Sequence, residues 1–191
     1  MSLAASDNER YTYHDYLTWD DDERWELIDG VLHSMSPAPS ARHQFISMGL
    51  SAQIYNFLSQ TPCRIAAAPF DVRLPKGDEA DNQVDTVVQP DIVVICDPAK
   101  LDDRGCRGAP EFVVEILSPS TADKDRTIKL ALYENRGVKE YWIIDPEDNT
   151  VTVHLLGPDC HYDAPAIHAG QGDIKVATLP GLEIDLDAVF R

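Results

Sequence analysis

The sequence has no long apolar run. No stretch approaches the roughly 20 consecutive apolar residues that cross a membrane, and the first residues lack the basic start and apolar stretch of a secretion signal. We therefore expect a soluble, cytoplasmic protein. Hydrophobic residues make up 43% of the 191 residues, as in globular proteins, and a chain of this length predicts a single domain over residues 1–191.

Clustered metal-binding cysteines and histidines are also missing. The four cysteines, Cys63, Cys96, Cys106 and Cys160, form no Cys-x-x-Cys pair. Without a secretion signal they are predicted to be reduced thiols rather than disulfides. The six histidines show neither His-Glu-x-x-His nor zinc-finger spacing. These absences argue against a structural zinc site.

Basic residues are scarce. The chain has 16 Lys and Arg against 33 Asp and Glu, which gives a net charge of −17. A polyanion would be repelled at long range, and no basic stripe compensates. The charge therefore argues against tight, nonspecific binding of nucleic acid. Acidic clusters at 20–23, 78–81 and 102–103 are predicted to be solvated loops or helix starts.

Helical and strand signals alternate in the first half of the chain. A short amphipathic helix is predicted within 11–25. Asp29-Gly30 lies between apolar residues and predicts a hairpin over 26–35. Ser40 can cap a helix that runs to about Ser59. Much of that helix's apolar face is expected from Phe45, Met48, Ile54, Phe57 and Leu58. Residues 64–74 are strand-like.

The second half of the chain has the same mixture. Strands are predicted over 92–95, 112–117, 139–145 and 150–156, and a helix over 122–136 that ends at Gly137. The remainder, 157–191, is expected to be loop and short strands. Helices and strands mixed in this order within one domain predict an α/β fold, with helices flanking a mixed central sheet.

One acidic residue lies inside a segment that otherwise predicts a buried strand. Glu115 interrupts the apolar run 112–117, and burying an ionised carboxylate costs several kcal/mol unless it is paired. Asp91 follows Pro90 at the start of strand 92–95, so two acids on neighbouring strands suggest a divalent metal. Two plainer interpretations stay open. Asp91 could cap a turn, and Glu115 could form a structural ion pair with Lys129 or an arginine.

The segments around Asp91 and Glu115 form a more specific sequence pattern than the two acids alone. It reads Gln89-Pro90-Asp91-Ile92, then the run 108–120, then Asp125, Lys129 and Tyr133, then the run 137–146; upstream lie the run 25–30, Ser36-Pro37 with His43, and the run 69–74. These segments cover about residues 11–156. They closely resemble the Uma2 family, also called DUF820, of restriction-endonuclease-like proteins in the PD-(D/E)xK nuclease superfamily.

The resemblance implies a restriction-endonuclease-like PD-(D/E)xK core and a metal-dependent phosphodiesterase site. That superfamily carries Asp on one strand, Asp or Glu on the next, and Lys two residues later; here Asp91 and Glu115 fit, but Leu117 replaces the lysine. In the family the lysine looks to come from the following helix, at Lys129. Asp125, Lys129 and Tyr133 would share one helical stripe. Lys124 lies off this stripe and is expected to tolerate substitution.

The resemblance also implies a ligand set. Asp91, Glu115 and the backbone carbonyl of Ile116 would hold Mg²⁺ or Mn²⁺. Two further residues have open roles. Glu26 is either an additional acid of the site or a solvated strand-edge residue, and His43 is either a phosphate or base contact or a surface imidazole. Asp71 also has two possible roles: it is either a strand residue that faces the site or a charged residue at the edge of the sheet.

The sequence thus predicts an endonuclease that hydrolyses phosphodiester bonds of nucleic acid with Mg²⁺ or Mn²⁺, and no membrane partner. The alternative is an inactive nuclease-fold module that acts as a regulator or protein-interaction partner, which the charge of −17 favours. Hydrolysis of another phosphoester is a third reading. The choice between DNA and RNA, and whether the chain forms a homodimer, stay open.

Overall fold

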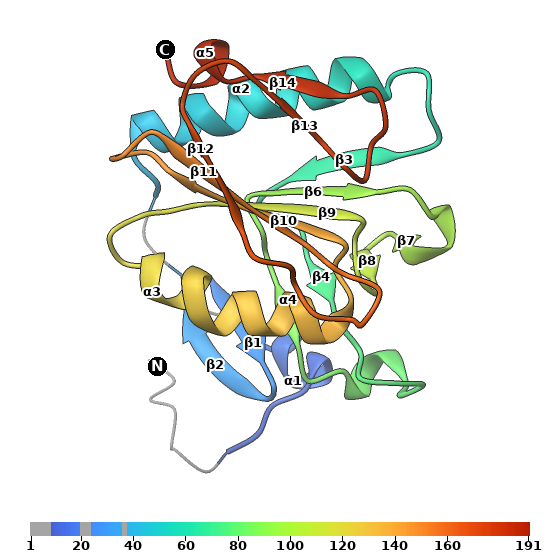
Figure 1. Cartoon of the computed structure of the whole chain (residues 1–191). Coiled ribbons are helices and arrows are strands. Elements are labelled where there is room, and N and C mark those ends of the chain that lie inside the picture. The colour runs from blue at the N-terminus through green and yellow to red at the C-terminus, as the bar shows by residue number, and fades with distance from the viewer. Residues whose placement is uncertain (1–8, 20–23, 36–37) are drawn as a thin grey trace.

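The computed structural model describes residues 9–19, 24–35 and 38–191. Its centre is a six-stranded sheet in the order β12-β11-β10-β9-β6-β3 (Figure 1). β9 and β10 run parallel, and the other neighbours are antiparallel. The strands are β3 (Arg64–Ala67), β6 (Ile92–Ile95), β9 (Phe112–Ile116), β10 (Glu140–Asp145), β11 (Thr150–Leu155) and β12 (Ala166–Ala169). The predicted mixed α/β fold is confirmed.

Helices cover both faces of this sheet. α2 (Ala41–Leu58) lies on one face, and α3 (Ala122–Lys124), a π-helical turn η3 (Asp125–Lys129) and α4 (Leu130–Arg136) lie on the other (Figure 1). Side chains alternate along β9, so Phe112, Val114 and Ile116 pack toward α2, whereas Val113 and Leu117 pack toward α4. Glu115 shares the α4 face by the same alternation.

A second, more irregular sheet has the order β2-β1-β5-β4-β8-β7. Its strands are β1 (Trp25–Ile28), β2 (Val31–Ser34), β4 (Val72–Arg73), β5 (Val87–Val88), β7 (Leu101–Asp102) and β8 (Gly105–Arg107). Beside them lie α1 (Tyr13–Tyr16) and the 3₁₀ turns η1 (Asp81–Gln83) and η2 (Pro98–Lys100). The predicted strand 64–74 is therefore divided between the two sheets, and the helix predicted within 11–25 has only four described residues. The acidic run 20–23 and Ser36-Pro37 lie outside the described residues.

The first hairpin forms where the sequence predicts it. β1 and β2 pair antiparallel through a turn in which Asp29 and Gly30 both have positive φ, at +48° and +79°. Two positive φ angles in succession are what a type I′ turn requires, and Asp-Gly adopts them at low cost. The hairpin fixes the position of Glu26 on β1.

α2 begins after Ser40, whose side chain accepts a hydrogen bond from the His43 backbone N–H, so the predicted cap is confirmed. The predicted apolar face is partly wrong. The side chains of α2 that face the sheet are His43, Ile46, Leu50, Ile54 and Leu58. Phe45 and Met48 are 72% and 69% exposed. The residues that face the sheet recur every three or four positions along one side of α2. Phe45 and Met48 lie on the opposite side of the helix.

The C-terminal segment belongs to the main core. β13 (Asp173–Lys175), β14 (Glu183–Asp185) and α5 (Leu186–Val189) follow one another there, and their apolar residues join one cluster with α2 and β9. Figure 1 shows α5 and β14 beside α2. Within the described residues, no helix is long and apolar enough to span a bilayer.

The prediction of four reduced cysteines is wrong for two of them. Cys63 and Cys96 form a disulfide, with their Cα atoms 3.9 Å apart. They directly flank the paired residues Arg64 and Ile95 of β3 and β6, so the strand register places them opposite each other. Their separation of 33 residues gave no sign of this. Cys106 is free and buried, and burial raises the pKa of its thiol to about 11; Cys160 is free and exposed.

Candidate active site

Asp91 and Glu115 lie opposite each other on neighbouring strands. Ile92 of β6 pairs with Val114 of β9 in antiparallel register, and extending that register by one residue places Asp91 across from Glu115. Directly opposite residues project from the same face of a sheet, with Cβ atoms about 5 Å apart. The fold therefore brings the two predicted acids together on the face that α4 covers.

Asp91 is held by the strand beside it. Its Oδ2 atom accepts a hydrogen bond from the Ile116 backbone N–H at 2.8 Å and lies 3.2 Å from Nε2 of His43. The turn-capping interpretation therefore does not describe this side chain, because its backbone donor is 25 residues away. One fifth of the Asp91 side chain is exposed, so the carboxylate also reaches solvent.

His43 is buried rather than on the surface, since it projects from the sheet-facing side of α2. Burial lowers the pKa of its imidazole, but the hydrogen bond and negative charge of Asp91, with smaller contributions from Ile116 and Asp125, together leave the pKa above its ordinary value. Its Nδ1 atom is buried and has no hydrogen-bond partner among the described residues. The surface interpretation of His43 is wrong, and the geometry makes it a residue that orients Asp91.

Glu115 is almost completely buried. Its Oε1 atom accepts hydrogen bonds from the Lys129 ammonium and from the Tyr133 hydroxyl, both at 2.8 Å. Burial raises the pKa of this carboxyl to about 8; Lys129 opposes the rise, and the nearby charges of Asp125, Asp91 and Glu26 add to it. Burial therefore favours the protonated form of Glu115, and a bound cation would favour the ionised form.

Lys129 lies at the centre of the acidic residues. Its Nζ atom is 2.7 Å from Oε1 of Glu26, 2.8 Å from Oε1 of Glu115 and 3.6 Å from Oδ1 of Asp125. Burial alone would lower its pKa, but these carboxylates raise the pKa well above the ordinary value. The side chain is consequently a fixed ammonium, able to stabilise negative charge and unable to accept a proton near neutral pH.

Glu26 is part of this cluster. It is fully buried on β1, and its oxygens contact Lys129, Lys124 at 2.6 Å and the Gln89 backbone N–H at 3.1 Å. Burial would raise its pKa, but the two ammonium groups lower it to about 2. Glu26 is thus ionised, and its interpretation as a solvated edge residue is wrong.

The helix that supplies the lysines is not a regular α-helix. Asp125–Lys129 forms a π-helical turn between α3 and α4, and the Tyr141 hydroxyl donates to the backbone carbonyl of Asp125 at 3.1 Å. π-turns of this kind often occur at functional sites. Lys124, at the end of α3 just before this turn, contacts Glu26 at 2.6 Å, so the expectation that Lys124 tolerates substitution does not fit its position.

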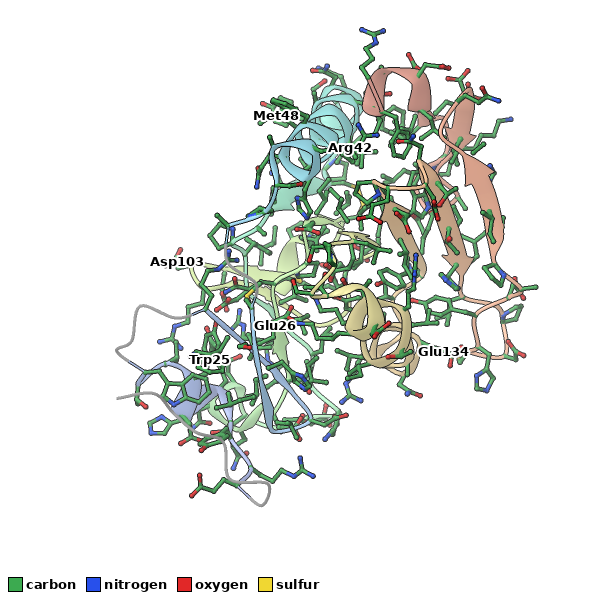
Figure 2. The ribbon with its side chains drawn as sticks, turned by 90° about the vertical axis from the view of Figure 1, so that its left-hand side faces the viewer. Trp25, Glu26, Arg42, Met48, Asp103 and Glu134 are labelled. Atoms are coloured by element: carbon green, nitrogen blue, oxygen red, sulfur yellow. A yellow bond between two sulfur atoms is a disulfide. The ribbon has the colours of Figure 1, made fainter. Side chains whose placement is uncertain are left out.

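A pocket of about 530 Å³ opens over these residues. Its walls include Asp91, Glu115, Lys124 and Lys129, together with Arg24 and Arg42. In Figure 2 Glu26 lies near the middle of the molecule, with Arg42 above it on α2. Asp71 does not line this pocket; its carboxylate accepts hydrogen bonds from Tyr16 and Gln89 instead. Neither Arg24 nor Arg42 was predicted from the sequence as a residue of the site, and the pocket was not predicted either.

The donor set fits a hydrated divalent ion. Within the described ranges, no group of three or more His, Cys, Asp or Glu side chains could enclose a metal, but Mg²⁺ is commonly held by one or two carboxylates and several waters. The cluster of Glu26, Asp91, Glu115 and Asp125 has four carboxyl groups against the two ammonium groups of Lys124 and Lys129. Asp125 Oδ1 is buried without a hydrogen-bond donor in the described chain. A further cation would balance this excess of acid.

Comparison with known proteins gives the family. The Uma2 model, described as "Putative restriction endonuclease", matches residues 13–187. The chain belongs to the Uma2 family. The Uma2 match extends about 30 residues beyond the C-terminal limit expected from sequence, in agreement with the packing of β13, β14 and α5 into the core.

Two known proteins are similar to this Uma2 protein over most of their length. The uncharacterized protein slr1290 of Synechocystis sp. is 27% identical over 180 residues, which are 93% of this chain and 90% of the relative. A crystal structure from Anabaena variabilis, of a protein described as "a putative nuclease belonging to DUF820", superposes with a TM-score of 0.73 at 20% identity and covers 94% of this chain and 97% of the other. This chain and the Anabaena variabilis protein therefore share a fold.

Proposed function

We propose that this protein is a divalent-metal-dependent endonuclease that hydrolyses phosphodiester bonds of nucleic acid. The observation that carries the proposal is the placement of Lys129. Its ammonium lies 2.8 Å from Glu115, while the position two residues after Glu115 is occupied by the apolar, buried Leu117. A cation that reaches Glu115 from the next helix supports a catalytic rather than a purely structural role.

The carboxylates of Asp91 and Glu115, with the backbone carbonyl of Ile116, are the proposed ligands of Mg²⁺ or Mn²⁺. When bound, such an ion supplies Lewis acidity toward the phosphate and lowers the pKa of a water ligand. Each carboxylate has one oxygen, Oδ1 of Asp91 and Oε2 of Glu115, that accepts no hydrogen bond from the described residues. These two oxygens are the ones available to an ion.

Protein side chains perform the remaining steps. His43 and the Ile116 N–H hold Asp91 in one orientation, and Tyr133 does the same for Glu115. Lys129 stabilises the negative charge that develops on a nonbridging phosphate oxygen, because an ammonium placed in advance needs no reorganisation during the reaction. Arg42 and Lys124, at the pocket wall, would contact flanking phosphates.

The test is a cleavage assay. Single- and double-stranded DNA and RNA are incubated with the protein and Mg²⁺, Mn²⁺ or EDTA. We expect cleavage of at least one substrate with a metal ion and none with EDTA, and loss of cleavage in folded Asp91→Ala and Glu115→Ala proteins. The exposed Asp103→Ala change, outside the pocket, is the matched control. Cleavage that survives both site substitutions would show that the chemistry lies elsewhere.

A further inference from the structure

The outer side of α2 carries an exposed apolar stripe. Phe45, Met48 and Tyr55 are 72%, 69% and 64% exposed, and Ala52 between them is also exposed. Their spacing of three, four and three residues places all four on one side of the helix, opposite the residues that pack on the sheet. Figure 2 shows Met48 on the outer side of α2. A helix that is apolar on both sides is normally covered on both.

The charge of this region differs from that of the rest of the chain. Residues 30–70 contain no Asp or Glu, although the chain has 33 in its 191 residues. The only Lys or Arg in this stretch are Arg42 and Arg64. The guanidinium of Arg42 already donates to the Pro146 carbonyl and to the Asn149 side chain. The four stripe residues are therefore uncharged and lie in a segment without carboxylates on a strongly acidic protein.

We propose that this stripe is the contact surface between two copies of the chain. Two molecules that each carry a charge of −17 repel each other, and the repulsion is smallest where both surfaces lack carboxylates. A nucleic acid fits the stripe poorly, because binding to phosphates requires Lys or Arg and the stripe has none. The α2 stripe, defined as Phe45, Met48, Ala52 and Tyr55, thus fits a second copy best.

The order of the four residues is also self-complementary. In an antiparallel pair of helices with the two-fold axis at residue 50, Phe45 of one copy faces Tyr55 of the other, and Met48 faces Ala52. This pairs two aromatic rings at each end and sets a large side chain against a small one near the axis, as close helix packing requires. Each contact occurs twice, as expected for a symmetric dimer.

The arrangement leaves the pocket open. The four stripe residues are not among those that line it, whereas Arg42, His43 and Gln44 at the start of the same helix are. With a rise of 1.5 Å per residue, the two Arg42 positions would be separated by about 24 Å along the paired helices. The dimer would therefore carry two separate pockets, and disrupting it should not alter their residues.

The test measures mass in solution by light scattering coupled to size exclusion. The natural protein is expected to elute at twice the 21.3 kDa of the chain, and Phe45→Glu at the mass of one chain, with dimer affinity lowered by at least about 30-fold, as for an aromatic hot-spot residue of an interface. Ile167→Glu, which changes another exposed apolar residue in the same way, should remain dimeric. Circular dichroism checks that every variant is folded.

A second pair of variants tests the register. Phe45→Lys and Tyr55→Glu should each give single chains, and the double variant Phe45→Lys/Tyr55→Glu should recover the dimer, because the new charges face each other across the contact. A natural protein that stays monomeric at 100 µM would overturn the proposal, as would a dimer that persists in Phe45→Glu. A monomeric protein whose binding of nucleic acid is lost in Phe45→Glu would also overturn it and assign the stripe to nucleic acid.

Discussion

The Lys129 ammonium lies 2.8 Å from the Glu115 carboxylate, although the two residues come from different elements and are 14 positions apart in the sequence. The strand position that would carry a lysine in a PD-(D/E)xK pattern holds Leu117, which is buried in the apolar core on the α4 side. The ammonium is therefore delivered by the helix that covers the strand.

Substitution of Lys129 should separate turnover from metal binding. We expect Lys129→Ala to lower the cleavage rate by about 100-fold or more, the usual effect of removing a group that stabilises transition-state charge. The affinity for Mn²⁺ should not decrease, because the lysine is not a ligand and its positive charge opposes a second cation. Rates and calorimetric titrations check both expectations.

The matched control is Lys175→Ala, since that side chain is 83% exposed and has only a distant ion pair with Glu183. Removal of Lys129 also leaves buried carboxylates without their partner, which typically costs about 3–5 kcal/mol, so assays should be run below the midpoint of thermal unfolding. A Lys129→Ala protein that is folded, binds Mn²⁺ and cleaves at the natural rate would contradict the assignment.

Lys124 should matter for stability. Its ammonium lies 2.6 Å from the fully buried Glu26, and a hydrogen bond to a charged group contributes about 1.5–3 kcal/mol. We expect Lys124→Met to lower the free energy of unfolding by about this amount, measured by urea denaturation. In a Glu26→Gln background the same change should cost less. Equal costs in both backgrounds would mean that the contact contributes nothing.

The metal-free protein should lose stability as the pH rises. Because the pKa of Glu115 is raised from 4.5 to about 8 in the folded state, the folded protein holds this proton more tightly than the unfolded chain. The contribution is fully present below about pH 4.5 and disappears as the pH passes 8. His43, whose pKa is also raised, acts in the same direction.

Thermal unfolding in EDTA between pH 5 and pH 9 measures this effect. Glu115→Gln should flatten the pH dependence, whereas Glu183→Gln, on the exposed end of β14, should leave it unchanged. The same slope in the natural protein and in Glu115→Gln would show that Glu115 does not titrate in this range.

Binding to linear duplex DNA should be weak and only slightly dependent on salt. The pocket offers three cations that could contact phosphates, Arg24, Arg42 and Lys124, and each neutralised phosphate adds about −0.9 to the slope of log K against log salt concentration. We therefore expect a slope no steeper than about −3 per chain. Nanomolar affinity for random duplex with a much steeper slope would refute this.

The sequence predicted the parts of the site that depend on local pattern. An acid within an apolar strand, Glu115, and an acid at a strand entrance, Asp91, were visible from the alternation of residue types. The Asp29-Gly30 turn and the Ser40 cap were visible because their signals lie within a few residues. Each of these features depends on short-range geometry, which the chain specifies directly.

Other features depend on contacts between distant segments. Glu26 is buried as a charged group because it pairs with Lys124 and Lys129, which lie about 100 residues later in the sequence. Lys124 contacts Glu26 on β1, 98 residues away in the sequence, which helical spacing does not reveal. The disulfide of Cys63 and Cys96 follows from the pairing of β3 and β6. The exposed side of α2 was misassigned because that helix has apolar residues on both of its sides.

Calorimetric titration with Mn²⁺ measures whether Asp91 and Glu115 together hold a divalent ion, as we propose. We expect one Mn²⁺ per chain for the natural protein and for Asp103→Asn, which makes the same chemical change on an exposed residue outside the pocket. Asp91→Asn and Glu115→Gln should each lower the affinity by at least about tenfold. Equal Mn²⁺ affinity in all four proteins, or no binding by the natural protein, would contradict the proposal.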